Sequence, residues 1–261
     1  MNTVCYFRSF AVAALFAVNA GGQPQPDAAE ALPTAASILD RYVEVTGGKA
    51  AYQKHKTQVM QGVLAFAAQG ITGKLTRYAA GPDKEYSVAE LGQIGKIESG
   101  YSNGVAWEKS ALLGPRLKSG EEFVLAQREA YFNQELEWRT IYPKVETKGL
   151  ENAEAQECYK LILTPKSGRP ETRFYSKATG LLVKTTMTGT SPMGDVNVEV
   201  TTFDYKSFDG VLYPAHSKHK AAGQDLDMVI TSITFDEPIP NEYFDVPAEI
   251  KAKLPKPSAA K

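Results

Sequence analysis

The chain has 261 residues but only two cysteines, Cys5 and Cys158. Cys5 precedes an apolar stretch at residues 10–18, which is too short to span a bilayer and is followed by small residues. Residues 1–20 are therefore predicted to be a secretory signal peptide that is cleaved near Ala20, and the mature protein is expected to be periplasmic or secreted. Cleavage leaves Cys158 as the only thiol, so no intrachain disulfide can form and the fold must depend on its hydrophobic core.

An excess of charge of one sign is also lacking. The sequence has 29 Lys and Arg against 30 Asp and Glu, a formal net charge of −1, and loss of Arg8 with the signal peptide makes it −2. Such a chain has no electrostatic footprint for nucleic acid or for an anionic membrane surface. No second apolar run approaches the roughly 18 residues of a membrane-spanning helix, and no cysteine directly follows the first run to carry a lipid anchor. We therefore expect neither a nucleic-acid partner nor a transmembrane segment in the mature chain.

The sequence lacks the motifs of common catalytic and phosphate-binding sites. Each Gly-Lys pair lacks the earlier glycine and the following Ser or Thr of a phosphate-binding loop. The turn at residues 189–194 has one residue too many for the nucleophile elbow of a hydrolase. These absences predict a protein that has no cofactor, no metal and no catalytic residues, and that is not an enzyme. A pair of carboxylates acting as acid and base is the alternative that the sequence leaves open.

The histidines and the remaining cysteine are expected to be structural. His216 and His219 are three residues apart on a predicted strand, so their side chains should point to opposite faces and cannot share a metal ion. Lys218 and Lys220 share the face of His216, which is typical of a solvated edge strand. Cys158 alternates with other strand residues and is interpreted as a packing residue.

What the sequence does contain is about a dozen strand-length pieces separated by turns rich in Gly, Pro, Asp and Asn. A two-residue period begins at Thr57, and apolar stripes of helical period occur near residues 35–43, after the N-cap candidate Thr34, and within residues 119–133. This order predicts a mainly β, α+β fold: one large antiparallel sheet with two or three helices against one face.

Composition divides the chain into further regions. Residues 21–33 are rich in Gly, Pro and Gln and are predicted to be a flexible linker. Residues 34–250 form the predicted domain. Residues 251–261 have the composition of a disordered tail.

Several predicted strands carry apolar residues on both faces, for example Met60 and Leu64 against Val59 and Val63. This pattern fits a strongly curved sheet, or incomplete barrel, whose concave face is covered by the helices while part of its outer face is also buried. Ordinary packing of two sheets in a sandwich is the alternative.

Aromatic side chains are spread over the strands and the middle helix. Large flat side chains on a concave sheet can line an apolar pocket, although any one of them can equally fill the core. The candidate lining residues are Phe66, Tyr78, Tyr86, Trp107, Phe123, Tyr131, Trp138, Phe174 and Phe203.

Three stretches carry a family resemblance: an opening helix at residues 38–48, a turn and strand at 177–184, and a closing pattern within 203–214 and 239–247. In these stretches the chain resembles the periplasmic lipoprotein-carrier superfamily, which includes the outer membrane lipoprotein-sorting factors LolA and LolB and the regulator RseB. The resemblance implies an unclosed barrel whose apolar interior receives acyl chains, without catalysis.

These patterns lead to one principal expectation and two alternatives. We expect a carrier or chaperone that shelters a lipid or lipoprotein acyl chain in an apolar concavity, beneath a helical lid around residues 119–133. An envelope sensor or accessory domain that binds a protein partner, as in RseB, is the first alternative. An uncharacterised hydrolase is the second.

Overall fold

The computed structural model describes residues 31–191 and 194–255. The predicted signal peptide lies outside these residues, as do most of the predicted linker and residues 256–261 of the predicted tail. Within the described ranges, no helix combines the length and the apolar character needed to cross a membrane.

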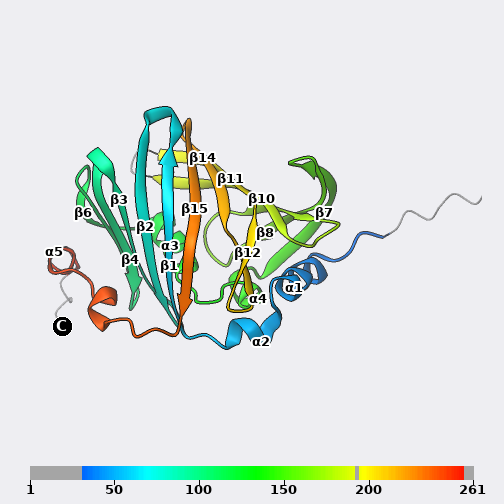
Figure 1. Ribbon diagram of the computed structural model, residues 1–261, viewed down its shortest axis with the longest axis horizontal. Helices are drawn as coiled ribbons and strands as arrows, with labels where there is room; N and C mark the ends of the chain where they lie inside the picture. Colours follow the sequence, from blue (N-terminus) through cyan, green and yellow to red (C-terminus); the bar gives the residue numbers. More distant parts are fainter. Residues whose placement is uncertain (1–30, 192–193, 256–261) are drawn as a thin grey trace, which may run out of the picture. The chain divides into compact units, whose positions relative to one another are not determined.

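A single antiparallel sheet of thirteen strands dominates the folded unit (Figure 1). In spatial order its strands are β6 (Gly114–Leu117), β5 (Val105–Ser110), β4 (Gly95–Ser102), β3 (Lys84–Leu91), β2 (Ile71–Ala80), β1 (Thr57–Phe66), β15 (Gln224–Phe235), β14 (His216–Ala221), β11 (Gly194–Thr202), β10 (Leu182–Ser191), β9 (Glu171–Ser176), β8 (Gln156–Thr164) and β7 (Lys144–Ala153). The end strands β6 and β7 do not pair with each other, so the sheet stays open. The predicted fold class, a mainly β incomplete barrel, is confirmed.

Short helices and one small hairpin complete the unit. They are α1 (Ala35–Val45), α2 (Gly48–Gln53), the 3-10 helix η1 (Ala67–Gln69), the 3-10 helix η2 (Gly92–Ile94), α3 (Gly120–Glu129), α4 (Trp138–Ile141), the hairpin of β12 (Tyr205–Phe208) with β13 (Val211–Pro214), the 3-10 helix η3 (Asn241–Phe244) and α5 (Ala248–Lys251).

Helix α1 forms where its apolar stripe predicts it. The Thr34 hydroxyl caps it by accepting a hydrogen bond from the Ser37 N–H at 3.1 Å. The helix buries Ala35, Ile38, Leu39, Tyr42 and Val43. Most of this stripe packs against Leu161, Leu163 and Tyr175 on β8 and β9. Gly47 and Gly48 end the helix with φ values of 134° and 76°, which glycine adopts at little cost.

The sheet curves so strongly that one short helix reaches both of its halves. Helix α3 contacts β4 and β5 near one end of the strand order and β10 near the other. Ten residues of α-helix span only about 15 Å, so these strands must approach each other across the concave side. Figure 1 shows α3 and α4, in green, behind the central strands.

Two adjacent glutamates in the first turn of α3 connect the halves of the sheet. Glu122 pairs with Arg116 of β6 at 2.8 Å. Glu121 pairs with Arg169, just before β9, at 2.9 Å and accepts a hydrogen bond from Thr190 of β10 at 3.0 Å. The positive end of the helix dipole also favours both carboxylates. Helix α3 is therefore held at its N-terminus from two sides.

The C-terminal segment covers the outer face of β2 to β5. Tyr78 stacks on Tyr243 with ring centroids 4.4 Å apart, and Tyr86 stacks on Trp107 at 6.1 Å. We call this group the outer cluster: Tyr78, Tyr86, Trp107, Tyr243, Phe244 and Ile250. A Cβ on Gly100 would lie 2.8 Å from the Trp107 ring, so only glycine fits there. The outer cluster does not extend to β1, whose outer-face residue Val63 is 42% exposed, so it leaves the two-faced apolar pattern of that strand unexplained.

Several local predictions differ from the structure. Strand β14 lies between β11 and β15, so the prediction of an edge strand is wrong. Its lysines occupy the outer face, where Lys218 stands opposite Asp227 and Lys220 opposite Asp225 in the ladder with β15, an arrangement that an interior strand tolerates. Strand β6 and the hairpin of β12 with β13 were not predicted, because each strand has only four residues.

Candidate functional site

A cavity of about 520 Å³ lies on the concave face, between the sheet and residues 120–142, which we call the covering segment. Strands β1, β2, β3, β9, β10, β11, β14 and β15 all contribute side chains to its wall. The volume falls in the range of about 300–1,000 Å³ that is typical of small-molecule sites. We call this space the inner cavity.

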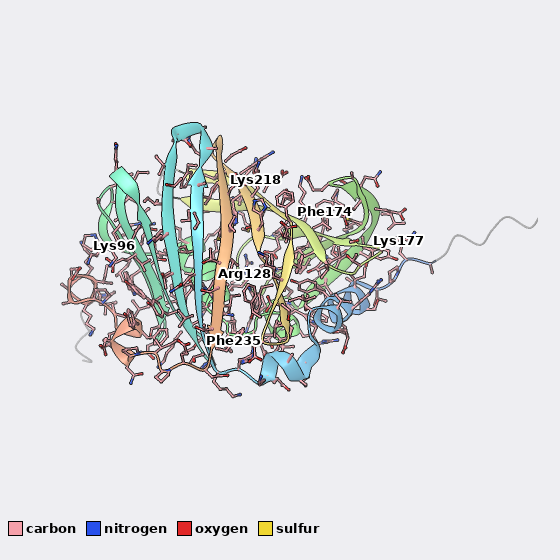
Figure 2. The ribbon with its side chains drawn as sticks, in the orientation of Figure 1. Lys96, Arg128, Phe174, Lys177, Lys218 and Phe235 are labelled. Carbon is pink, nitrogen blue, oxygen red and sulfur yellow. The ribbon has the colours of Figure 1, made fainter. Side chains whose placement is uncertain are left out.

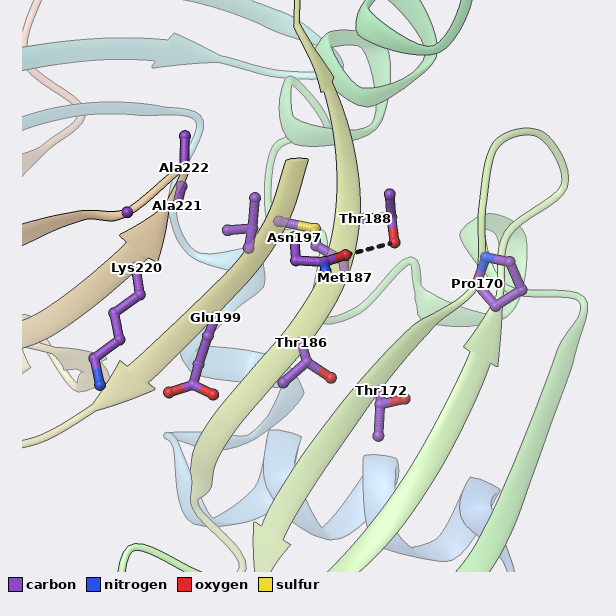
Figure 3. A pocket seen from close by; sticks show the side chains of 12 residues that line it. Pro170, Thr172, Thr186, Met187, Thr188, Asn197, Glu199, Lys220, Ala221 and Ala222 are labelled. Atoms are coloured by element: carbon purple, nitrogen blue, oxygen red, sulfur yellow. Dashed lines mark hydrogen bonds between the residues drawn. The ribbon is translucent and has the colours of Figure 1, made fainter. Parts of the chain in front are cut away.

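The two-residue period of the strands decides which side chains reach the inner cavity. One row across β9, β10, β11 and β14 lines it: Arg173, Thr185, Val200 and His219. The neighbouring row points to the other face of the sheet: Thr172, Thr186, Glu199 and Lys220 (Figure 3). That outer row belongs to a trough of about 550 Å³, which is more open to solvent and is lined by a mixture of polar and apolar side chains. The enclosed inner cavity is therefore the better candidate for a binding site.

One side of the inner cavity is apolar. Its residues come from strands that are adjacent or close in the sheet and include Met60, Leu75, Val200, Met228 and Ile230. A hydrocarbon chain placed along them would lose contact with water on one side without displacing a charged group.

Arginines that already have partners also line the inner cavity, next to these apolar residues: Arg77 lies directly opposite Met60 in the ladder of β1 with β2. Arg77 Nη2 lies 3.0 Å from Glu85 Oε2 and also donates to the backbone carbonyl of Glu129 at 3.1 Å. Burial opposes the charge of Arg77, but the Glu85 carboxylate outweighs it, so the pKa of Arg77 is raised. This arginine is a fixed cation with its counter-ion in place.

Arg173 belongs to a second network. Its Nη2 atom lies 2.6 Å from Glu171 Oε1, and Arg128 Nη2 (Figure 2) lies 3.1 Å from the other oxygen of Glu171. The Tyr142 hydroxyl donates to Glu171 at 2.8 Å. Burial would raise the pKa of Glu171, but Arg173, Arg128 and Tyr142 together lower it. Glu171 is thus a charged carboxylate that two arginines share.

Glu129 and Glu135 differ from these paired groups. Both line the inner cavity, and within the described ranges neither forms an ion pair or a hydrogen bond with another side chain. Burial raises the pKa of both carboxyl groups. The charges of Arg173 and Arg77 oppose this rise only in part for Glu135. The inner cavity therefore contains carboxylates that lack a counter-ion.

Tyrosines surround Glu135. Six of them line the inner cavity: Tyr42, Tyr52, Tyr131, Tyr142, Tyr175 and Tyr213. Burial raises the pKa of five tyrosines in this region more than any other cause does. The negative charge of Glu135 raises the pKa of each of them further: Tyr42, Tyr52, Tyr175, Tyr205 and Tyr213. Glu135 is thus electrostatically coupled to most of the rings around it.

Ser217 and His219 also face the inner cavity, with Oγ and Nε2 2.9 Å apart. Burial lowers the pKa of His219 and favours its neutral form. A hydrolytic pair needs a third group that orients the histidine and donors for an oxyanion. No carboxylate within the described ranges bonds to His219, and Ser217 lies inside a strand that is paired on both sides. The pair therefore lacks two parts of a catalytic site.

His216 points to the opposite face, as predicted. It bonds to Asp227 at 3.2 Å and packs against Phe203. In the part of the chain that the structure describes, no group of three or more His, Cys, Asp or Glu side chains is placed to hold a metal ion.

Polar contacts fasten the covering segment to the rest of the unit. Arg139 binds both oxygens of Asp40, at 2.9 and 2.7 Å, and the Trp138 indole N–H donates to the same carboxylate at 3.2 Å. The Asn133 amide donates to the backbone carbonyl of Tyr52 at 2.8 Å. Helix α3 itself has no fully buried residue. The segment is thus fixed by polar ties along its length and, after α3, by the buried side chains of Ala130, Trp138, Ile141 and Tyr142.

The candidate lining residues from the sequence fall into separate places. Tyr131 and Trp138 line the inner cavity. Tyr78, Tyr86 and Trp107 belong to the outer cluster on the other face. The structure thus brings only two of these five side chains to the cavity.

The other four candidates also lie outside the cavity lining. Phe123 packs α3 against Tyr101. Phe174 (Figure 2) lies in a buried cluster with Cys158. Phe203 packs on His216, and Phe66 ends β1. Phe123 and Phe174 thus contribute to packing elsewhere in the fold, and Phe203 is 36% exposed.

Apart from Tyr131, sequence reasoning did not identify the tyrosines of the cavity, and it identified none of its charged groups. The clearest signal for a charged lining residue is Arg77, which sits between Leu75 and Ala79 on one face of a strand. A charged side chain that lies between apolar side chains on the buried face of a strand needs a partner of opposite charge. Glu135 gives no such signal, because it lies in an irregular segment between α3 and α4.

No family model and no curated protein matches the sequence. Solved structures match its fold. They include the LolA superfamily protein NE2245 from Nitrosomonas europaea, with a TM-score of 0.56 and 13% identity over 82% of this chain and 99% of that chain. A DUF1329 family protein from Desulfovibrio piger gives 0.54 and 14%, over 81% and 97%. A putative outer membrane lipoprotein-sorting protein domain from Vibrio parahaemolyticus gives 0.51 and 14%, over 81% and 97%. The chain thus has the fold of the LolA superfamily, as its resemblance implied.

Proposed function

We propose that this protein is an exported carrier that holds the apolar chain of a lipid or lipoprotein in the inner cavity. The observation that supports the proposal best is the space itself, about 520 Å³ with an apolar side formed by β1, β2, β11 and β15. Protein interiors normally contain few voids larger than a water molecule. A space of this size, partly lined by hydrocarbon, suits a guest.

The energetics of such a guest are favourable. Each buried CH₂ group contributes about 0.8 kcal/mol, so about ten of them contribute roughly 8 kcal/mol. This corresponds to micromolar affinity before the cost of ordering the chain is subtracted. A long acyl chain can therefore bind without any specific polar contact.

Entry and release require the covering segment to move. The Asp40–Arg139 pair that ties it down has both side chains at least half exposed, and exposed ion pairs contribute only about 0–1 kcal/mol. This tie is therefore inexpensive to break, whereas the buried contacts of Arg128, Trp138 and Tyr142 must be replaced by contacts with the guest. We propose that residues 120–142 act as a lid.

The geometry gives less support to the two alternatives. A partner that adds a strand would need a free edge, but β6 has only four residues and β7 carries several charged side chains: Lys144, Glu146, Lys148 and Glu151. A hydrolase would need more than the incomplete Ser217–His219 pair. We therefore propose binding without catalysis, in the periplasm or outside the cell.

The proposal is tested on protein recovered after export of the full chain. Extraction with organic solvent and mass spectrometry should detect an amphiphile in near-equimolar amount. After its removal, the apolar fluorescent probe phenylnaphthylamine should bind saturably at one site. Protein that carries no amphiphile and shows no saturable uptake of the probe would contradict the proposal.

A matched pair of variants locates the site. Val200 faces the inner cavity, whereas Asn197, on the same strand, is exposed on the outer face. Val200→Trp should fill the cavity and weaken probe binding about tenfold or more, while Asn197→Trp should leave it unchanged. Equal binding by both variants would place the probe elsewhere.

A further inference from the structure

The charges at the inner cavity do not balance. Three arginines and four glutamates line it or belong to its ion-pair networks: Arg77, Arg128, Arg173, Glu85, Glu129, Glu135 and Glu171. With every carboxyl group ionised the sum is three positive against four negative charges, and burial favours the neutral forms of Glu129 and Glu135 as it does that of His219. The arginines are all paired, whereas Glu129 and Glu135 have no partner within the described ranges.

We infer that the inner cavity selects amphiphiles with a cationic head group of the ammonium type, and that Glu135 is the counter-ion of that head group. This inference rests on the proposed function and adds the chemical class of the guest's polar end. The apolar side of the cavity holds the chain, and the tyrosine-rich side around Glu135 holds the head.

The rings around Glu135 favour a cation over a neutral polar group. Ammonium groups are attracted to the faces of Tyr and Trp rings, most strongly where water is excluded. The protein already uses a neighbouring ring in this way, because Arg173 and Arg128 lie 5.3 and 5.7 Å from the centroid of Tyr142. Tyr42 and Tyr175, packed edge to face at 5.4 Å, lie on the same side.

An anionic head group would bind more weakly in the inner cavity than a cationic one. A carboxylate or phosphate would have to compete for Arg77 with Glu85, or for Arg173 with Glu171. Removing one partner from a buried pair leaves an uncompensated charge, which is strongly unfavourable. An incoming cation would not have to displace a side chain from Glu135, because within the described ranges this carboxylate forms no ion pair and only the more distant charges of Arg173 and Arg77 act on it.

The state of Glu135 in the free protein supports this assignment. Burial raises its pKa, which means that desolvation of its charge is not offset by the surrounding groups. A bound ammonium ion would supply the missing compensation. The ammonium group could be part of a zwitterionic phospholipid or of a simple long-chain amine, since both present the same charge.

The test compares head groups on one chain length. Dodecyltrimethylammonium, dodecyl maltoside, dodecyl sulfate and a lysophosphatidylcholine with a twelve-carbon chain displace phenylnaphthylamine from the mature protein, each below its micelle concentration. We expect the trimethylammonium compound to bind about tenfold more tightly than the maltoside. Glu135→Gln should remove this advantage, so that the trimethylammonium compound binds no more tightly than the maltoside. Tighter binding of the lysophospholipid than of the trimethylammonium compound would identify a zwitterionic lipid, and the reverse order a simple amine.

Glu137 provides the matched control. It lies two residues away on the covering segment, is exposed and does not line the inner cavity. Glu137→Gln should keep the preference, and Glu135→Asp should retain most of it because the charge remains. Circular dichroism confirms that each variant is folded.

The outcomes separate the two proposals. Equal binding of all head groups, or preference for the sulfate, would overturn the head-group inference while the carrier function stands. Absence of binding by every compound would overturn the carrier function itself.

Discussion

On the outer face of β2 to β5, aromatic rings stack against one another and the C-terminal segment closes over them. On the inner face, tyrosines surround a space of about 520 Å³ and share it with charged groups. Trp107 is 3% exposed and stacks on Tyr86, whereas the Tyr142 hydroxyl donates to Glu171 and two arginines lie over the Tyr142 ring. Aromatic side chains thus form a packed cluster on the outer face of the sheet and line a cavity on its inner face.

The two faces differ in the neighbours of their aromatic rings. In the outer cluster, rings stack on rings, and the Tyr86 hydroxyl donates to Glu98 at 2.7 Å. In the inner cavity, hydroxyls and charges form networks that keep the wall in place while leaving room inside. The stability of the protein should therefore depend on the outer cluster and the buried networks, and ligand binding on the cavity wall.

The largest expected effect comes from breaking the outer cluster. Trp107→Ala should lower the free energy of unfolding by about 4 kcal/mol, because it removes a buried ring from a filled cluster. Urea denaturation measures the loss. Leu112→Ala, at a side chain that is 87% exposed, should change stability by less than about 0.5 kcal/mol. Comparable losses in both variants would show that the outer cluster is not tightly packed.

The next effect comes from the buried network beside the inner cavity. Glu171→Gln should cost about 3 kcal/mol, since it leaves Arg173 and Arg128 without a counter-ion. Because the pKa of Glu171 is lowered on folding, its contribution is present above the unfolded value of about 4.3 and is lost as pH falls through the folded value. The wild type should therefore lose stability on acidification below about pH 5 more steeply than Glu171→Gln.

An exposed carboxylate serves as the control for this pH dependence. Glu146 pairs with Lys144 and Lys148 on the surface. Glu146→Gln should lower the free energy of unfolding by less than about 1 kcal/mol and leave the steep loss of stability below about pH 5 unchanged. A Glu171→Gln variant that is as acid-sensitive as the wild type would rule out the shared-carboxylate network.

A cavity tyrosine should matter less than a packed ring. The Tyr52 hydroxyl bonds to the buried Thr46 hydroxyl at 2.8 Å, so Tyr52→Phe should cost about 1 kcal/mol in thermal or urea unfolding. Tyr131 has no side-chain hydrogen bond within the described ranges, and Tyr131→Phe should be nearly neutral. A loss near that of Trp107→Ala would mean that the cavity wall is as tightly packed as the outer cluster.

The smallest effect on stability is expected at the tie of the covering segment. Asp40→Asn should lower stability by less than about 1 kcal/mol, because the pair with Arg139 is exposed. The same change should speed release of phenylnaphthylamine several-fold in stopped-flow measurements, since the tie resists opening. Glu151→Gln, which breaks an exposed pair with Lys160, should leave the release rate unchanged. Equal rates in all three proteins would exclude residues 120–142 as a lid.

The sequence predicts the architecture well because that part depends on local patterns. Thr34 caps α1 as expected, and the two-residue period at Thr57 marks β1. Short elements escape prediction, since four residues such as β6 hold too little periodic signal. The prediction that β14 is an edge strand was wrong, because strand order depends on contacts that are distant in the sequence.

The cavity is harder to derive from the sequence. The two-residue period of each strand, together with the register between strands, shows that Tyr86 and Trp107 share a face of the sheet. It does not show which face of the sheet is concave. That choice depends on where the C-terminal segment and α3 pack, which is tertiary information. Glu135 carries no periodic signal at all, because its position follows from the ties of the covering segment.

The most direct measurement of the central claim is the affinity of neutral alkyl maltosides of increasing chain length. If the inner cavity buries the chain, each added CH₂ should strengthen binding about fourfold until the chain fills the space. Val200→Trp should make the gain stop at a shorter chain, and Asn197→Trp should not. An affinity that is independent of chain length would contradict the account.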